Sequence, residues 1–195
     1  MENEVKEPAL KYNYTYAAEY LEMERASSEK HELHQGTVIT MTGASLKHNQ
    51  IVSNLLGNLN PFLKGKSCQV FPSVLRTKIP SSDTFTYPDL SIVCGEPELM
   101  DEQFDTILNP SVIIEVLSPS TEKYDKGNKF FYYMQIESLT EYFMISSMET
   151  YIHIARKQND SSWKFEEIKD VSASLLISTI ECNIPLSDIY HNVKF

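Results

Sequence analysis

The sequence predicts an α/β or α+β sheet protein. Two observations carry this prediction: helix-type patterns lie at the start and after residue 118, and β-branched apolar segments fill much of the remainder. A third observation, the absence of repeats, low-complexity segments and linkers, indicates a single domain over residues 1–195.

The composition of the 195 residues is that of a folded domain, with 42% hydrophobic, 11% aromatic and 23% charged residues. This apolar content can form one core and excludes a disordered or collagen-like chain. No apolar run approaches the ~20 residues that a bilayer span needs. The acidic N-terminus lacks the layout of a signal peptide, so we expect no membrane association and a cytoplasmic location.

The first half predicts two helices around a hairpin. Residues 1–30 form a helical lead-in, in which Thr15 caps a helix that runs to about Arg25. The segments HELH and TVITM predict a hairpin around the dipeptide QG. A second helix follows Gly43 and ends near Gly65, with one apolar face formed by Val52, Leu55, Leu56, Leu59, Phe62 and Leu63.

The second half predicts mainly strands. They are expected at Cys68–Ile79 with a break at Pro72, and at Tyr87–Cys94, Val112–Leu117, Glu141–Ser146, Tyr151–Ala155 and Trp163–Ile168. A helix is expected from Ser118 to about Gln135, and the segment IPLSDIY predicts a short closing turn or helix.

Cysteine and histidine patterns give no metal-binding signature. The three cysteines are scattered without a CxxC pair, so we expect them to be reduced and mostly buried. His31 and His34 form an HxxH pair without further ligands at zinc spacing, and we expect both on the surface.

Charge is unevenly distributed along the chain. The net charge is −10, but Leu33–Ser82 contains no acid and five basic residues, Lys47, Lys64, Lys66, Arg76 and Lys78. This segregation indicates either one basic face on an acidic body or chance variation over a solvated acidic surface.

Glu115 is the most informative residue, because it interrupts the apolar strand VIIEVL, where a desolvated carboxylate without a partner costs several kcal/mol. Asp89 heads another apolar strand, and the two acids could meet on adjacent strands. Such oxygen ligands suit Mg²⁺ or Mn²⁺. The alternative is that Asp89 caps a turn and Glu115 pairs with a basic residue.

The helix after this strand carries two acid–lysine pairs at i, i+4 spacing, Asp125 with Lys129 and Glu122 with Lys126. They are either surface ion pairs worth a few tenths of a kcal/mol, or one of the lysines points back toward Glu115. An ammonium group there could orient water or neutralise phosphate charge.

The order of these residues resembles the PD-(D/E)xK nuclease superfamily. More closely, the chain resembles the Uma-two family of restriction-endonuclease-like proteins, and the similar features span nearly the whole chain. They are Glu32-Leu33 with Gly36, Ser45-x-x-His48, Arg76, Tyr87-Pro88-Asp89-Leu90, Val112–Thr121, Tyr124-Asp125-Lys126-Gly127-x-Lys129 and Glu141-Tyr142.

The resemblance implies a restriction-endonuclease-like mixed β-sheet flanked by helices. It implies that Asp89 and Glu115 bind Mg²⁺ or Mn²⁺, with the Val116 carbonyl as a further ligand and Glu32 as a further carboxylate. Leu117 stands where the general pattern has lysine, so that role would pass to Lys129 or, less favourably, to Lys126.

Two further residues have two interpretations each. His48 either approaches the metal site or substrate phosphate, or makes structural hydrogen bonds at a helix start. Arg76 either contacts phosphate or pairs with a carboxylate.

The predicted function is a metal-dependent DNA endonuclease. The alternatives are a catalytically inactive nuclease-fold protein that binds nucleic acid and a protein-interaction module that forms a homodimer.

Overall fold

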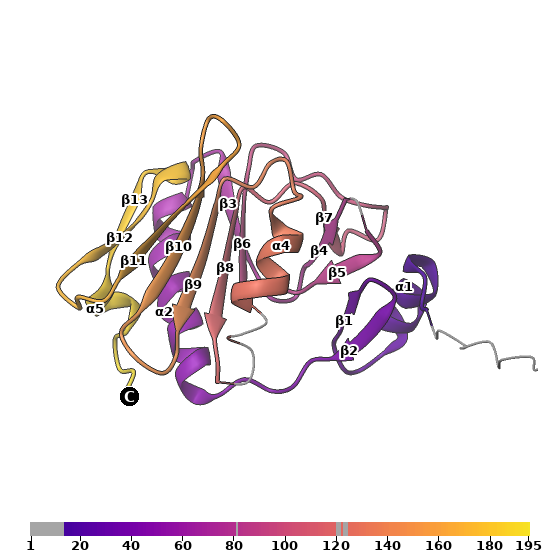
Figure 1. Ribbon diagram of the computed structural model, residues 1–195, viewed down its shortest axis with the longest axis horizontal. Helices are drawn as coiled ribbons and strands as arrows, with labels where there is room; N and C mark the ends of the chain where they lie inside the picture. Colours follow the sequence, from indigo (N-terminus) through magenta and orange to yellow (C-terminus); the bar gives the residue numbers. More distant parts are fainter. Residues whose placement is uncertain (1–13, 81, 120–121, 123–124) are drawn as a thin grey trace, which may run out of the picture.

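A six-stranded mixed sheet is the centre of the fold in the computed structural model, which describes residues 14–80, 82–119, 122 and 125–195 (Figure 1). The order is β11-β10-β9-β8-β6-β3, and the only parallel pair in this described sheet is β8 with β9. The strands are β3 (Cys68–Pro72), β6 (Leu90–Cys94), β8 (Val112–Leu117), β9 (Glu141–Ser146), β10 (Ile152–Lys157) and β11 (Trp163–Ile168). The predicted sheet flanked by helices is confirmed.

The strand that carries Glu115 is buried on both faces. All six residues of β8 are buried, as its apolar sequence predicted. Val112, Ile114 and Val116 pack into the larger core on one face, whereas Ile113 and Leu117 belong to the smaller core on the other. Because side chains alternate along a strand, Glu115 lies on the face of the smaller core.

Helix α2 (Leu46–Leu63) covers the larger core, behind the sheet in Figure 1. Its buried residues Ile51, Leu55, Leu59 and Leu63 recur every four positions and form one face. Ser45 begins the helix by accepting a hydrogen bond from the His48 N–H at 3.2 Å. The predicted helix is therefore confirmed, and its first turn holds a candidate site residue in place.

The opposite face of the sheet is covered by a π-helical segment, η1 (Asp125–Lys129), which continues into α4 (Phe130–Tyr133). Both lie in front of β8 in Figure 1. They form part of the predicted helix from Ser118 to about Gln135; residues 120, 121, 123 and 124 lie outside the described residues.

A second sheet, in the order β2-β1-β5-β4-β7, packs beside the first with α1 (Ala17–Ala26) against it. Its strands are β1 (His31–His34), β2 (Thr37–Thr40), β4 (Arg76–Ile79), β5 (Thr84–Thr86) and β7 (Thr106–Ile107). The predicted hairpin is confirmed, and its turn residues Gln35 and Gly36 have φ of 48° and 83°.

Some local predictions for this part were wrong. Tyr16, not Thr15, is the N-cap of α1, and the Glu19 side chain accepts the Tyr16 N–H at 3.1 Å. The strand predicted at Cys68–Ile79 is interrupted after Pro72, as expected, but its two parts, β3 and β4, belong to different sheets.

The C-terminal part completes the larger core. It consists of β12 (Ser174–Ile177), the short 3₁₀ helix η2 (Ser178–Ile180), β13 (Cys182–Pro185) and α5 (Leu186–Ile189). The segment IPLSDIY contains the predicted short helix, whereas β12 and β13 were not predicted. No helix in the described part of the chain combines the length and the apolar character needed to cross a bilayer.

The expectation of reduced cysteines is wrong for two of the three. Cys68 on β3 and Cys94 on β6 are directly opposite each other in the antiparallel pair and form a disulfide. Cys182 is free and buried. The sequence could not predict this bond, because the partners come together only through the pairing and register of β3 with β6.

The disulfide predicts the thiol count of the purified protein. Unfolded in denaturant without reductant, the chain should show one reactive thiol with an aromatic disulfide reagent, since only Cys182 is free. After reduction the same assay should give three thiols. Three thiols before reduction would contradict the bond.

Candidate active site

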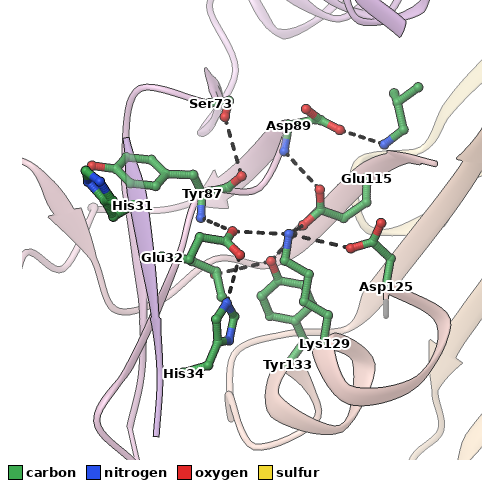
Figure 2. A network of polar contacts seen from close by, with 12 residues as sticks. His31, Glu32, His34, Ser73, Tyr87, Asp89, Glu115, Asp125, Lys129 and Tyr133 are labelled. Atoms are coloured by element: carbon green, nitrogen blue, oxygen red, sulfur yellow. Dashed lines mark hydrogen bonds and ion pairs between the residues drawn. The ribbon is translucent and has the colours of Figure 1, made fainter. Parts of the chain in front are cut away.

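The two acids that the sequence singled out lie side by side. Strands β6 and β8 are antiparallel and pair Leu90 with Ile114, so Asp89 comes next to Glu115. The Asp89 N–H donates to Glu115 Oε2 at 3.4 Å, and Asp89 Oδ2 accepts the Val116 N–H at 2.7 Å (Figure 2). Of the alternative interpretation, the turn-capping role of Asp89 does not describe this arrangement, whereas the pairing of Glu115 with a basic residue is present, because Glu115 binds Lys129.

Lys129 joins these acids from the π-helical segment. Its Nζ lies 2.9 Å from Glu115 Oε1, 3.2 Å from Glu32 Oε1 and 3.6 Å from Asp125 Oδ1 (Figure 2). Lys129 is only 6% exposed, so this ammonium is largely withdrawn from water. These charges raise the pKa of Lys129 well above its usual value against the opposing effect of burial, which keeps it charged.

Lys126 does not reach the site. It pairs with Glu122 at 2.6 Å, and its side chain remains 30% exposed. Of the two lysines considered from the sequence, only Lys129 contacts Glu115. Both predicted i, i+4 pairs are present, but only the pair with Asp125 belongs to the buried network.

Glu32 holds Lys129 from the other sheet. It lies on β1, is buried, and accepts hydrogen bonds from the Tyr87 N–H and from the His34 ring, both at 2.9 Å. Burial alone would raise the pKa of Glu32. Lys129, His34 and the Tyr87 N–H outweigh that effect and lower the pKa to about 2, so Glu32 remains a carboxylate.

Glu115 has the opposite electrostatic environment. Burial is the main cause that raises its pKa to about 8; Lys129 opposes this, and the charges of Asp89, Asp125 and Glu32 add to it. The Tyr133 hydroxyl donates to Glu115 Oε1 at 2.8 Å. One ammonium does not fully offset the neighbouring carboxylates, so the site favours a proton or a further cation at Glu115.

This pKa predicts how metal-free protein responds to pH. Between about pH 4.5 and 8, folded Glu115 retains a proton that the unfolded chain has lost, so rising pH favours unfolding. Relative to Glu115→Gln, the wild-type free energy of unfolding should fall by up to about 1.4 kcal/mol per pH unit in this window. Urea unfolding in EDTA measures it, and parallel curves would contradict the prediction.

His48 lies at the more open side of the site. Its Nε2 is 2.9 Å from Asp89 Oδ1, and its ring also hydrogen-bonds to the main chain of Val116. Burial alone would lower the pKa of His48, but its contacts with Asp89 and Val116 raise it above the usual value. The structure therefore supports the interpretation in which His48 approaches the site, while its own N–H serves the start of α2.

Arg76 is not brought into the site, and the carboxylate interpretation holds. It is buried at 3% exposure and pairs with Asp105. It also donates to the Tyr87 hydroxyl at 3.2 Å, and that hydroxyl donates to Glu24 at 2.9 Å. Tyr87 thus connects two polar networks. Its hydroxyl group belongs to the network of Arg76 and Glu24, and its main-chain N–H donates to Glu32.

Two site residues were missed from the sequence. His34 was expected on the surface but is buried against Glu32, which faces it within β1. Tyr133 packs in the smaller core, but its hydroxyl reaches Glu115. The spacing of Asp125, Lys129 and Tyr133, four residues each, was the available signal that they share one helix face.

The residues present fit a hard divalent cation by their chemistry. Asp89, Glu115 and the Val116 carbonyl would offer only oxygen ligands, and Mg²⁺ commonly takes one or two carboxylates with the remaining positions filled by water. Among the described residues, no group of three or more His, Cys, Asp or Glu forms a ready metal cage. Lys129, Tyr133, His48 and the Val116 N–H engage the carboxylate oxygens of Asp89 and Glu115 in this arrangement.

One family model covers most of the chain. Residues 17–186 match the Uma2 family model, described as "Putative restriction endonuclease". The chain belongs to the Uma2 family. This confirms the resemblance seen in the motifs, from Glu32 through the helix that carries Lys129.

Two curated relatives of this Uma2 chain come from Synechocystis sp. (strain ATCC 27184 / PCC 6803 / Kazusa). "Uncharacterized protein sll1609" is 35% identical over 162 residues, which cover 83% of this chain and 92% of the relative. "Uncharacterized protein slr1290" is 33% identical over 177 residues, covering 91% and 92%.

A solved structure has the same fold. It is described as a "putative nuclease belonging to DUF820 from Anabaena variabilis ATCC 29413", and it aligns with a TM-score of 0.74. The alignment covers 90% of this chain and 97% of that one at 18% sequence identity. At this identity the likeness shows that the Uma2 chain and this structure share a fold.

Proposed function

We propose that this protein is a metal-dependent DNA endonuclease that hydrolyses phosphodiester bonds. The observation that supports it best is the convergence of Asp89, Glu115 and Lys129: two acids on adjacent strands and a buried ammonium 2.9 Å from one of them. Membership in a family whose model is described as "Putative restriction endonuclease" supports the same reaction class.

In this proposal Asp89, Glu115 and the Val116 carbonyl hold Mg²⁺ or Mn²⁺, which when bound activates water and stabilises phosphate charge. Lys129 orients the attacking water or neutralises charge that develops on the phosphate. Glu32 keeps the ammonium in position through its 3.2 Å ion pair. His48 contacts Asp89 from the open side, where a substrate phosphate would approach.

The absence of lysine at Leu117 fits this assignment. The Leu117 side chain is fully buried in the smaller core, beside Tyr133 and Tyr142 rather than in the carboxylate cluster. A lysine on η1 therefore provides the cation that the general motif takes from the strand, and the inactive alternative does not follow from Leu117 alone.

The test is nicking of supercoiled plasmid with Mg²⁺ or Mn²⁺, against EDTA, together with Mn²⁺ binding by calorimetry. The proposal expects metal-dependent conversion to open circles and binding of the ion at micromolar to millimolar concentration. Nucleic-acid binding without metal binding or cleavage would overturn it in favour of an inactive nuclease-fold protein.

A further inference from the structure

A groove lies beside the first turn of α2, next to the candidate active site. It has a volume of about 540 Å³ and is lined by the N-cap Ser45, by Leu46, Lys47 and Gln50 of α2, and by residues 192–194 near the C-terminus. The C-terminus, the first turn of α2 and the C-terminal end of β8 lie at the same end of the molecule (Figure 1).

The walls of this groove are fixed to each other. The Asn54 amide of α2 donates to the main-chain carbonyls of Ile189 and His191, at 2.9 and 2.8 Å. The Gln50 amide in turn donates to the Asn54 side chain at 2.9 Å. The groove is therefore preformed, and a ligand would not have to order its walls on binding.

The groove is basic in an acidic protein. Lys47 and Lys194 are among its lining residues, which include no aspartate or glutamate, whereas the whole chain carries −10. The single basic face considered from the sequence is not formed. Lys64 follows the last turn of α2, about 25 Å from Lys47 at 1.5 Å per residue, and Arg76 is buried against Asp105.

The first turn of α2 separates this groove from the metal site. His48 contacts Asp89 on one side of the helix, while Gln50, about 200° further round, faces the groove. The distance across a helix is ~10 Å. Since a nucleic-acid strand rises ~3.4 Å per nucleotide, this corresponds to about three nucleotides.

We propose that this groove binds the sugar–phosphate backbone of the nucleic-acid strand about three nucleotides from the cleaved bond, with Lys47 and Lys194 contacting phosphates. The inference rests on the proposed nuclease function and adds where the substrate strand runs. The two lysines favour a polyanion as the ligand. Because the groove lies beside His48 and Asp89, the polyanion that fits best is the nucleic-acid strand that also enters the candidate active site. The amides of Gln50 and Asn192 add hydrogen-bond donors.

The test compares two charge-reversed double variants. Lys47→Glu/Lys194→Glu changes the groove, and Lys64→Glu/Lys66→Glu makes the same charge change after the far end of α2. Binding of a fluorescent DNA oligonucleotide is measured by anisotropy, with Ca²⁺ replacing Mg²⁺ to prevent cleavage, from 50 to 200 mM salt. Plasmid nicking with Mg²⁺ at high protein concentration is measured in parallel.

We expect the groove variant to bind at least about tenfold more weakly at 50 mM salt, since charge reversal removes two phosphate contacts. The slope of log K against log salt should fall by about 2. Nicking should persist at high protein concentration, because the metal ligands are unchanged. The control variant should bind within about twofold of wild type.

Equal weakening in both variants, or wild-type binding by the groove variant, would overturn the inference while plasmid nicking stayed metal-dependent. A changed oligomeric state in the groove variant without a change in DNA affinity would assign the groove to a second copy instead. If DNA binding depends on the groove but no metal supports nicking, the cleavage proposal is overturned and the assignment of the groove as a nucleic-acid-binding site stands. A wild-type protein that binds no DNA would overturn both.

Discussion

Asp89→Asn and Glu115→Gln should each reduce metal-dependent nicking by at least about a thousandfold, equivalent to ~4 kcal/mol of transition-state stabilisation. Each substitution keeps the shape of the side chain but removes the negative charge that would bind the cation. The two acids lie together and share their neighbours, so the double variant should lose little more than either single variant.

Initial rates of plasmid nicking measure this effect, and Mn²⁺ calorimetry should show that both variants lose the ion. Glu122→Gln is the matched control, because Glu122 pairs with Lys126 in partial contact with solvent and away from Glu115. It should retain wild-type activity. Circular dichroism should show intact folding for all variants. Full activity of Asp89→Asn or Glu115→Gln would refute the metal-ligand assignment.

Lys129→Met should both abolish nicking and strongly destabilise the fold. It would leave Glu32 and Glu115, whose side chains are 8% and 5% exposed, without their shared ammonium. Breaking a buried ion pair in this way costs about 3–5 kcal/mol. Lys126→Met removes a pair with a 30% exposed lysine and should cost less than about 1 kcal/mol.

Urea unfolding measures both substitutions, and a double variant separates stability from catalysis. Lys129→Met/Glu32→Gln removes the charge of one of the two acids that have lost the ammonium, so it should regain part of the lost stability and remain inactive. Lys129→Met with wild-type nicking, or with the same small loss of stability as Lys126→Met, would contradict the role assigned to this lysine.

The sequence was sufficient to predict the elements and residues whose environment depends on nearby positions in the chain. An acid inside the apolar segment Val112–Leu117 had to find a partner, and i, i+4 spacing put Asp125 and Lys129 on one face. The same reasoning placed Asp89 at the head of a neighbouring apolar strand, and the family motifs added Glu32 and His48. All of these lie in one connected network in the structure.

Other features depend on contacts between distant segments and were not accessible. The Cys68–Cys94 bond requires the register of β3 with β6. The pairing of Arg76 with Asp105 requires β4 to lie beside β7, a strand of two residues that has no periodicity to detect. β12 and β13 are also short, with four residues each, and their buried side chains take their place in the larger core beside residues from distant parts of the chain.

The π-helical form of η1 makes the length of this segment as important as its composition. A π-helical turn closes its hydrogen bonds over five residues rather than four, and so contains one residue more than an ordinary turn. Wound as an ordinary α-helix at 100° per residue, the same five residues would turn Lys129 further around the axis relative to Asp125 than the wider π-helical turn does. The direction of the ammonium toward Glu115 therefore depends on the winding of this segment as well as on its sequence.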